Sequence, residues 1–316
     1  MEENIKKYFN KQGLGGVLKI EELADGSSNN HLNYKIKTAQ GVFVARIKKS
    51  GDLLSYSNLA DEYTILKLIE KYNIGPKVFR VDLENFNTPI LIEEFIEGKM
   101  FTDVQDASEE MFEKSLNVLV ETSKINIGFD EFPFKSTYQT YQVHSKVWAM
   151  CLDDIEKSLG SDYFIINKFK AVIKSAQDIL EKKEGLLEAV PKEFIYNDIH
   201  PGNIFWVPAE NRIKFIDWQK VSLGDPVFMV ALFARRFGHL WKMESKEFAA
   251  KVLNFYKSKK EIENIEELFF ARILERAVSD MIWSVWADIK RGVPIKITNI
   301  DENKYFSEVK ELILEM

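Results

Sequence analysis

The stretch of sequence that decides the fold is Tyr196-Asn197-Asp198-Ile199-His200-Pro201-Gly202-Asn203, which is followed by Asp217. Between them, residues 204–216 consist of two apolar runs joined by the turn Pro208-Ala209-Glu210-Asn211, a pattern typical of a β-hairpin. A hairpin brings its two ends together. We therefore expect the polar side chains of the first stretch to lie close to Asp217.

Three of these polar residues suit separate tasks in phosphoryl transfer. A carboxylate such as Asp198 can accept the proton of an attacking hydroxyl, which contributes roughly 10²–10⁴-fold to a rate. Oxygen ligands from Asn203 and Asp217 suit Mg²⁺, which prefers hard donors and keeps substrate phosphates in its coordination shell. The Asp-x-x-x-x-Asn spacing with a later Asp is the kinase arrangement. The alternative is that these residues only form turns and cap a strand, but their order, spacing and hairpin together favour catalysis.

The pattern of apolar and polar residues changes near Gly98. Before it, residues 17–23 and 32–36 alternate between apolar and polar residues as strands do, and 42–47, 78–81 and 89–92 are further predicted strands, with one helix at 57–72. After it, helical patterns dominate, at 108–125, 138–158, 161–184, 226–242, 246–256 and 262–291. The sequence therefore predicts an α+β protein with a nucleotide-binding N-terminal lobe, residues 1–97, and a catalytic and substrate-binding C-terminal lobe, residues 98–316.

The residues around the hairpin resemble a known family. The stretch 196–203, followed by Phe215-Ile216-Asp217-Trp218, is similar to the signature of the aminoglycoside phosphotransferase and choline/ethanolamine kinase superfamily, and Gly224-Asp225-Pro226 matches a Gly-Asp-Pro that often follows. The resemblance implies a bilobal protein-kinase-like fold, with a small antiparallel-sheet lobe and a larger helical lobe. It also implies that Asp198 is the catalytic base and that Asn203 and Asp217 hold Mg²⁺.

The chain departs from the family pattern at two places. Tyr196 replaces the His that usually begins the motif, and no Asp follows Gly-Asp-Pro in the run 226–233. The sequence leaves open whether either departure alters activity.

The small lobe offers a test of the resemblance. Val44-Ala45-Arg46 places Arg46 on the third strand, where such kinases hold a cation against the nucleotide phosphates, with Lys48 on the same strand face as a fallback. Glu62 shares its helix face with apolar residues, so it points inward and needs a partner, which Arg46 would supply. The alternative is a surface ion pair.

Two further segments are candidates for nucleotide binding. Ser27, Ser28 and Asn29 lie in a polar loop that could cradle phosphate, although an ordinary hairpin loop would look the same. The segment 93–98 resembles a kinase hinge, where main-chain groups of Glu94 and Ile96 would meet the base. ATP and Mg²⁺ are therefore the expected cofactors, and the choice between ATP and GTP is left open.

A helix near the C-terminus carries the best indication of the acceptor. Asp280, Trp283 and Trp286 follow one another at intervals of three residues and form a connected stripe. Aromatic faces attract quaternary ammonium groups, and a nearby carboxylate adds to that attraction. The run resembles the Trp-rich helix of choline kinases, which implies a choline or ethanolamine pocket. The alternative is ordinary core packing.

The sequence thus predicts a small-molecule kinase that transfers the γ-phosphate of ATP to a hydroxyl of a choline- or ethanolamine-like amino alcohol. One alternative acceptor is an aminoglycoside or another hydroxylated metabolite. A second alternative is a catalytically inactive kinase-like binding protein. A protein kinase is disfavoured, because the chain contains no Asp-Phe-Gly and no Ala-Pro-Glu segment.

The composition excludes several other classes. The 43 Lys and Arg against 49 Asp and Glu give a net charge of −6, which does not favour nucleic acid or anionic lipid. Cys151 is the only cysteine, so an internal disulfide or a Cys-based zinc site is excluded. There is no signal-peptide pattern and no membrane span. We expect a cytoplasmic protein whose partners are a nucleotide and a small, cationic, hydroxylated substrate; association into a homodimer is left open.

Overall fold

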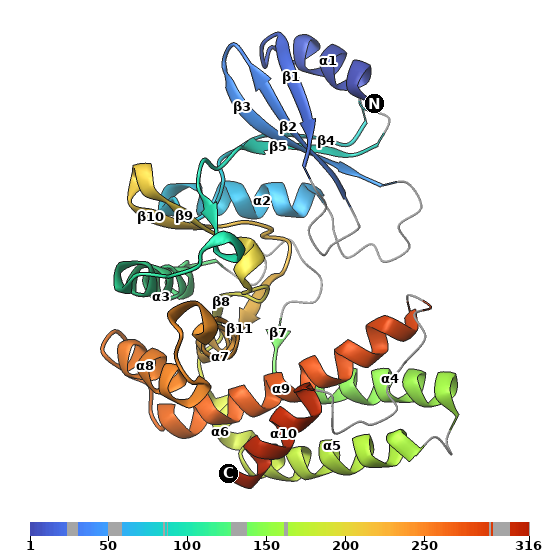
Figure 1. The fold of residues 1–316 in the computed structure, drawn as a ribbon, viewed down its shortest axis with the longest axis vertical. Helices are drawn as coiled ribbons and strands as arrows, with labels where there is room; N and C mark the ends of the chain where they lie inside the picture. The colour runs from blue at the N-terminus through green and yellow to red at the C-terminus, as the bar shows by residue number, and fades with distance from the viewer. Residues whose placement is uncertain are drawn as a thin grey trace. The chain divides into compact units, whose positions relative to one another are not determined.

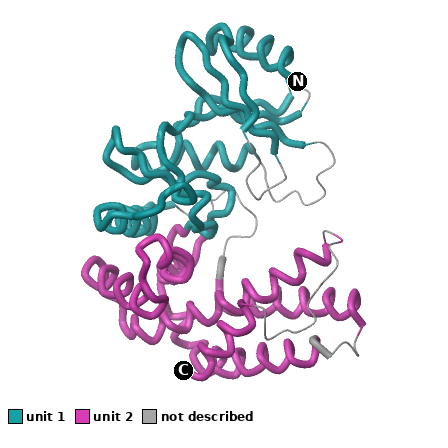
Figure 2. Tube along the Cα trace, viewed as in Figure 1, with its two compact units in different colours: residues 1–135, 196–221 teal, residues 136–195, 222–316 magenta. Residues whose placement is uncertain are grey.

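The computed structural model describes residues 1–23, 31–49, 59–84, 86, 88–127, 138–160, 164–290, 292 and 304–315. The chain forms two compact units, each built from two separate segments (Figure 2). Unit 1 contains residues 1–135 and 196–221, and unit 2 contains residues 136–195 and 222–316. This division by packing differs from the lobes expected at 1–97 and 98–316, because the hairpin after Asn203 packs with the N-terminal segment. The lobe boundary itself stays a prediction.

Unit 1 is built on an antiparallel sheet with the strand order β1-β2-β3-β5-β4 (Figure 1). Its strands are β1 (Val17–Glu22), β2 (His31–Thr38), β3 (Gly41–Lys48), β4 (Val78–Asp82) and β5 (Ile90–Glu94). The remaining elements of unit 1 are α1 (Glu2–Lys11), α2 (Leu59–Ile69), β6 (Lys99–Met100), α3 (Glu109–Ser123), β9 (Ile204–Val207) and β10 (Arg212–Phe215), with 3-10 turns at Glu70–Tyr72, Phe101–Asp103, Pro201–Asn203 and Pro208–Glu210.

The two faces of this sheet have different contents, because side chains alternate along each strand. On one face, Phe43, Ala45 and Ile47 of β3 join Ile90 and Ile92 of β5 in an apolar cluster completed by α1. The other face carries Arg46 on β3, and its guanidinium reaches Glu62 of α2. The sheet therefore separates an apolar core from a charged interior.

The predicted hairpin is present as β9 and β10, which form a second sheet in the order β10-β9-β6. Asn211 closes its turn in the left-handed region, at φ 50°. β6 approaches the hairpin closely at Gly98, where an added Cβ would lie 2.5 Å from the carbonyl oxygen of Trp206. This position requires glycine, because any larger side chain would force the backbones apart.

Unit 2 is mostly helical. Its elements are β7 (Tyr138–Gln139), α4 (Tyr141–Leu159), α5 (Phe164–Lys182), α6 (Glu184–Ala189), β8 (Glu193–Tyr196), β11 (Val221–Gly224), α7 (Pro226–Phe237), a 3-10 turn (Gly238–Trp241), α8 (Ser245–Lys257), α9 (Ile265–Lys290) and α10 (Lys304–Glu315). The long helix α9 packs against α4, α7 and α10, and the three short strands pair in the order β7-β11-β8. Within the described ranges, no helix is both long and apolar enough to cross a membrane.

A buried ionic network joins the start of α7 to the middle of α9. Arg272 donates from Nε to Asp225 Oδ2 at 2.7 Å and from Nη1 to Glu275 Oε2 at 2.6 Å. Asp225, the acidic residue of Gly-Asp-Pro, also accepts from the Val227 amide and so caps α7. His144 Nδ1 lies 2.5 Å from Glu275 Oε1. Burial would raise the pKa of Glu275, but Arg272 and His144 lower it to about 2.

We expect Arg272→Met to destabilise the protein by about 3–5 kcal/mol, because two carboxylates would stay buried without their cation. Urea unfolding followed by tryptophan fluorescence measures this. Since the native pKa of Glu275 lies below its ordinary value of 4.5, its contribution is present above about pH 4.5 and is lost as the pH falls toward 2. Glu275→Gln should therefore lose less stability than wild type between these pH values.

The matched control is Lys174→Met, which breaks an exposed ion pair with Asp178 and should leave the unfolding midpoint unchanged. An Arg272→Met midpoint equal to wild type would contradict a stabilising role for the network.

Candidate active site

The loop between β8 and β9 is fixed to the far end of the hairpin by main-chain hydrogen bonds. The Ile216 amide donates to the carbonyl oxygen of Asn203 at 2.9 Å, and the Asn197 amide donates to the carbonyl oxygen of Lys220 at 2.8 Å. Inside the loop, His200 Nδ1 accepts from the Gly202 amide at 3.2 Å. These bonds hold the loop beside the segment that carries Asp217, as the hairpin pattern predicts.

Asp198 and Asn203 are in direct contact. Asn203 Nδ2 lies 3.1 Å from Asp198 Oδ2, 3.1 Å from the Asp198 carbonyl oxygen and 3.0 Å from the Tyr196 hydroxyl. Asn203 is buried, so these contacts fix the orientation of its amide. The amide nitrogen is committed to these acceptors, and Asn203 Oδ1 is the atom that suits a cation. Lys220 Nζ also lies 2.9 Å from Asp198 Oδ2.

Arg46 joins the sheet, helix α2 and the end of the hairpin. Its Nη1 donates to Glu62 Oε1 at 2.5 Å, and its Nη2 donates to Asp217 Oδ1 at 3.2 Å. Burial alone would lower the pKa of Arg46, but the carboxylates of Glu62, Glu93 and Asp217 raise it. The guanidinium is therefore charged at any physiological pH. The contact predicted between Arg46 and Glu62 is present.

Asp217 adopts a left-handed backbone conformation, at φ 61°. For a residue other than glycine this region is sparsely populated, although Asp tolerates it better than most. The conformation is held on one side by the Arg46 contact and on the other by the main-chain bond of Ile216. Strain of this kind, held by surrounding bonds, is common at functional sites.

Tyr196 connects the loop to the hairpin from inside the protein. It is fully buried, its hydroxyl donates to the Ile216 carbonyl oxygen at 2.7 Å, and the same hydroxyl accepts from Asn203 Nδ2. Its ring centroid lies 4.9 Å from that of Trp218. Burial and the nearby carboxylates of Asp198 and Asp217 raise the pKa of Tyr196 well above 10, so it stays a neutral donor. In this chain a phenol replaces the family's usual imidazole in this motif.

The donor set fits Mg²⁺. Asn203 and Asp217 offer an amide oxygen and a carboxylate, which are hard ligands. Among the described residues, no three His, Cys, Asp or Glu side chains gather where they could hold a metal by themselves. The remaining coordination positions would belong to phosphate oxygens and water, which is how Mg²⁺ usually binds in phosphoryl-transfer sites.

The segment expected to act as a hinge is anchored by its side chains. Glu94 accepts from Lys214 Nζ at 3.2 Å and from the Lys77 amide at 3.0 Å. Lys214 is almost completely buried and also contacts Glu210 Oε1 at 2.9 Å. Ile96 is buried at the end of the same segment. Ser27, Ser28 and Asn29 lie outside the described residues.

Three charged residues near this site were not predicted from the sequence, namely Glu93, Lys214 and Lys220. A lysine inside the apolar run Ile213-Lys214-Phe215 was a visible signal, because a buried lysine needs a carboxylate partner. Lys220 gave no such signal, since an isolated lysine in a loop is common.

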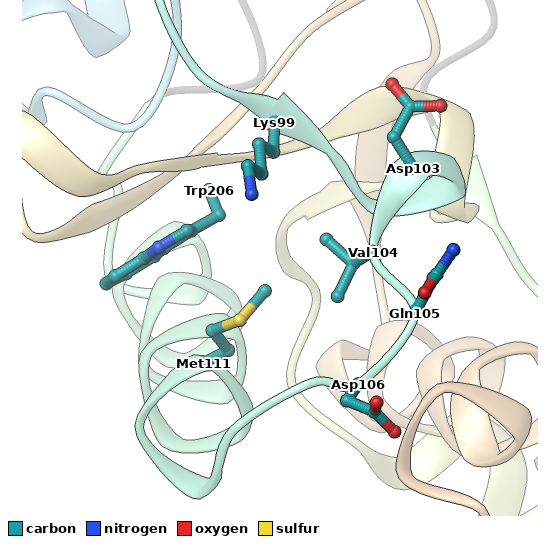
Figure 3. A pocket seen from close by; sticks show the side chains of 7 residues that line it. All are labelled: Lys99, Asp103, Val104, Gln105, Asp106, Met111 and Trp206. Carbon is teal, nitrogen blue, oxygen red and sulfur yellow. The ribbon is translucent and has the colours of Figure 1, made fainter.

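A cavity of about 370 Å³ opens elsewhere in unit 1, beside β6 and the start of α3 (Figure 3). Lys99 and Trp206 lie along one side of it, and Met111 and Val104 lie close by. None of the predicted catalytic or metal-binding residues lines this cavity.

The Trp-bearing helix α9 presents a different arrangement from the one expected. The Asp280 carboxylate contacts Arg235 Nη1 at 2.7 Å, Arg236 Nη2 at 3.1 Å and Arg276 Nη2 at 2.9 Å. Burial would raise the pKa of Asp280, but these three guanidinium groups lower it to about 2. Its negative charge is therefore already balanced.

The two tryptophans do lie together, with ring centroids 4.8 Å apart. Trp283 is 54 % exposed, so its ring is available to a ligand. Trp286 Nε1 donates to Asp154 Oδ2 of α4 at 3.0 Å, and Asp154 also contacts Lys290 Nζ at 2.8 Å. The carboxylate next to the tryptophan pair is thus Asp154.

The sequence model of the phosphotransferase enzyme family matches residues 19–258, well over half of the chain. The chain belongs to this family. It is therefore a phosphotransferase, and the resemblance inferred from the hairpin motif is confirmed. Among curated proteins, none matches the sequence significantly.

Solved structures similar to this family member share its whole fold. A choline kinase from Cryptosporidium parvum has a TM-score of 0.69 at 14 % identity, with 100 % of this chain and 96 % of that chain covered. A spectinomycin phosphotransferase, solved with ADP and spectinomycin, has a TM-score of 0.68 at 17 % identity, with 99 % and 97 % covered. An ethanolamine kinase from Plasmodium vivax has a TM-score of 0.62 at 15 % identity, with 94 % and 82 % covered. These likenesses confirm the expected bilobal protein-kinase-like fold.

We expect Tyr196→Phe to lower kcat by roughly 10–100-fold while nucleotide affinity changes little. The substitution removes the hydroxyl that bonds both the Ile216 carbonyl oxygen and the Asn203 amide. The lost bonding, about 1–3 kcal/mol, weakens the positioning of the loop 196–203. Steady-state kinetics and a nucleotide-binding titration separate the two effects.

Tyr256→Phe is the matched control, because the buried Tyr256 hydroxyl has no hydrogen-bond partner among the described residues. Its kcat should equal that of wild type. If Tyr196→Phe behaved in the same way, Tyr196 would not position the loop.

Proposed function

We propose that this phosphotransferase moves the γ-phosphate of ATP to the hydroxyl of a small amino alcohol of the choline or ethanolamine type. The observation that carries the proposal is the buried contact of Arg46 with both Glu62 and Asp217. It brings a cation suited to nucleotide phosphates into contact with a carboxylate suited to Mg²⁺.

In this proposal Asp198 is the general base. Its carboxylate is oriented by Asn203 Nδ2 and contacts Lys220 Nζ, and it would accept the hydroxyl proton. Asn203 and Asp217 would hold Mg²⁺, which when bound offsets the charge that develops on the transferred group. Arg46, fixed by Glu62, would bind the nucleotide phosphates, and main-chain groups of Glu94 and Ile96 would meet the base.

For the acceptor, we propose that Trp283 and Trp286 receive the cationic head group and that Asp154, not Asp280, supplies the nearby carboxylate. An exposed indole next to a second ring suits a quaternary ammonium, worth about 0.5–2 kcal/mol. Asp280 suits this task less, because three arginines contact it, whereas Asp154 is paired with one lysine, Lys290, and bonds Trp286 directly. The similarity to a choline kinase and an ethanolamine kinase supports this acceptor class.

An aminoglycoside or another hydroxylated metabolite remains the second candidate acceptor. It is favoured by the equally close structural similarity to a spectinomycin phosphotransferase. A coupled assay of ATP consumption with choline, ethanolamine and spectinomycin distinguishes the two candidates.

We expect Asp198→Asn to lower kcat by roughly 10²–10⁴-fold, because the amide cannot accept the proton, while ATP still binds. Turnover should also require Mg²⁺. The matched control is Asp178→Asn at an exposed position of α5, which should keep full activity. A variant at Asp198 with the wild-type rate would rule it out as the base. ATP binding without turnover of any acceptor in wild type would favour a kinase-like binding protein.

We expect Trp283→Ala to raise the KM for choline by roughly 3–30-fold and to leave the KM for ATP unchanged. Trp241→Ala, which removes an indole packed on Phe248 elsewhere in unit 2, should leave both constants unchanged. An unchanged choline KM in Trp283→Ala would show that the tryptophan pair is not the acceptor site.

A further inference from the structure

Glu93 faces the same interior as Arg46, although the sequence gives it no evident task. In the β3–β5 pairing, Val44 lies opposite Glu93 and Arg46 lies opposite Leu91. Facing residues of antiparallel strands share a side of the sheet, and positions two apart along a strand share it as well. Glu93 is therefore a diagonal neighbour of Arg46, on the charged face and one residue before Glu94.

The Glu93 side chain is buried and incompletely bonded. The residue is 93 % buried, and among the described residues its Oε2 has no hydrogen-bond partner. Burial first, and then the carboxylates of Glu62, Asp217 and Glu94, raise its pKa to about 8 against the opposing effect of Arg46. At neutral pH Glu93 is thus mainly a neutral carboxylic acid, with one donor and one acceptor.

Glu275 offers a comparison within the protein. Glu275 is also fully buried, but both of its oxygens are bonded, to Arg272 and to His144. A glutamate kept for structure alone is expected to be satisfied in this way, since an unpaired buried oxygen costs about 1–3 kcal/mol. Glu93 Oε2 shares its open state with other buried polar atoms, among them Glu62 Oε2. What distinguishes Glu93 is its place one residue before the segment proposed to meet the base, where a bound nucleotide would supply the missing partner.

We propose that Glu93 reads the base of the bound nucleotide, accepting a hydrogen bond from the 6-amino group of adenine and donating one to N7. This inference rests on the proposed function, because it requires a nucleotide whose phosphates lie at Arg46 and whose base lies at the segment after Glu93. Glu93 would give that site a preference for adenine over guanine, which the main-chain groups of Glu94 and Ile96 alone do not set.

The chemistry of the two bases decides the direction of the preference. If main-chain groups of Glu94 and Ile96 pair with one edge of the base, the second amino hydrogen and N7 remain on the neighbouring edge. Adenine shows a donor and an acceptor there, which is why Gln and Asn side chains read it with two bonds. A neutral carboxyl offers the same pair of groups. Guanine shows two acceptors, O6 and N7, and the carboxyl has only one proton.

The test uses the full chain with Mg²⁺ and measures dissociation constants of ATP, 7-deaza-ATP and GTP by calorimetry. The 7-deaza analogue differs from ATP only by the missing N7 acceptor. Wild type should bind it roughly 3–10-fold more weakly than ATP, the effect of one lost hydrogen bond. Glu93→Met should bind ATP more weakly, lose this discrimination and show a smaller preference for ATP over GTP.

Two further variants complete the comparison. Glu93→Gln keeps one donor and one acceptor and should retain the preference for ATP over its analogue. Glu97→Gln, at an exposed neighbouring position, should behave as wild type throughout.

The outcomes separate this inference from the proposed function. If wild type bound ATP and 7-deaza-ATP equally, or if Glu93→Met kept the full penalty, Glu93 would not contact N7, and the kinase assignment would stand. If wild type bound no nucleotide, the proposed function would fail and this inference with it. The wild-type comparison needs no substitution, so equal binding of ATP and 7-deaza-ATP would overturn the inference even if a variant does not fold.

Discussion

The burial of one guanidinium, that of Arg46, is the constraint on which the rest of the site depends. A charge removed from water costs several kcal/mol unless it is paired with good geometry. Arg46 meets this condition through Glu62 and Asp217, which come from α2 and from the segment after β10. Three parts of the chain that are distant in sequence must therefore meet at one point. The position of Asp217 is set by this requirement as much as by its own backbone.

Hydrogen bonds from two further buried side chains support this arrangement. Tyr196 holds the loop and the end of the hairpin with one hydroxyl, and Lys214 ties β10 to the proposed hinge through Glu94. Both side chains are buried, so neither bond competes with water. The groups proposed to bind nucleotide, metal and proton thus share one rigid framework, which is the condition for precise phosphoryl transfer.

Much of unit 1 could be predicted because its patterns are local. The strands β1 and β2 alternate between apolar and polar residues, and the hairpin has a clear turn. The pairing of Arg46 with Glu62 was predicted from helix periodicity together with the family resemblance. Helix α1 was missed, although Ile5, Tyr8 and Phe9 have helical spacing and are buried, because its other residues are mostly polar. β8 and β11 were missed because they are short and almost wholly buried, so they do not alternate.

The acceptor region shows where local patterns fail. Spacing on α9 placed Asp280 beside the tryptophans, but its partners come from α7 as well as from α9 itself. Asp154 reaches Trp286 from α4, more than a hundred residues earlier. No periodicity within one helix reveals such contacts. The kinase chemistry could therefore be predicted from the sequence. The carboxylate beside the tryptophan pair could be identified only from the packing of the helices in unit 2.

Unit 1 consists of two segments that are far apart in the sequence, and this sets the order in which its parts are synthesised. Residues 136–195 separate the sheet with Arg46 and Glu62 from the segment that carries Asp198, Asn203 and Asp217. During synthesis on the ribosome the residues of the sheet are therefore made well before residues 196–221. Closing so long a loop is a late and non-local event. The segment with the proposed catalytic residues is therefore the last part of unit 1 to be synthesised, and the contact of Arg46 with Asp217 cannot form before it.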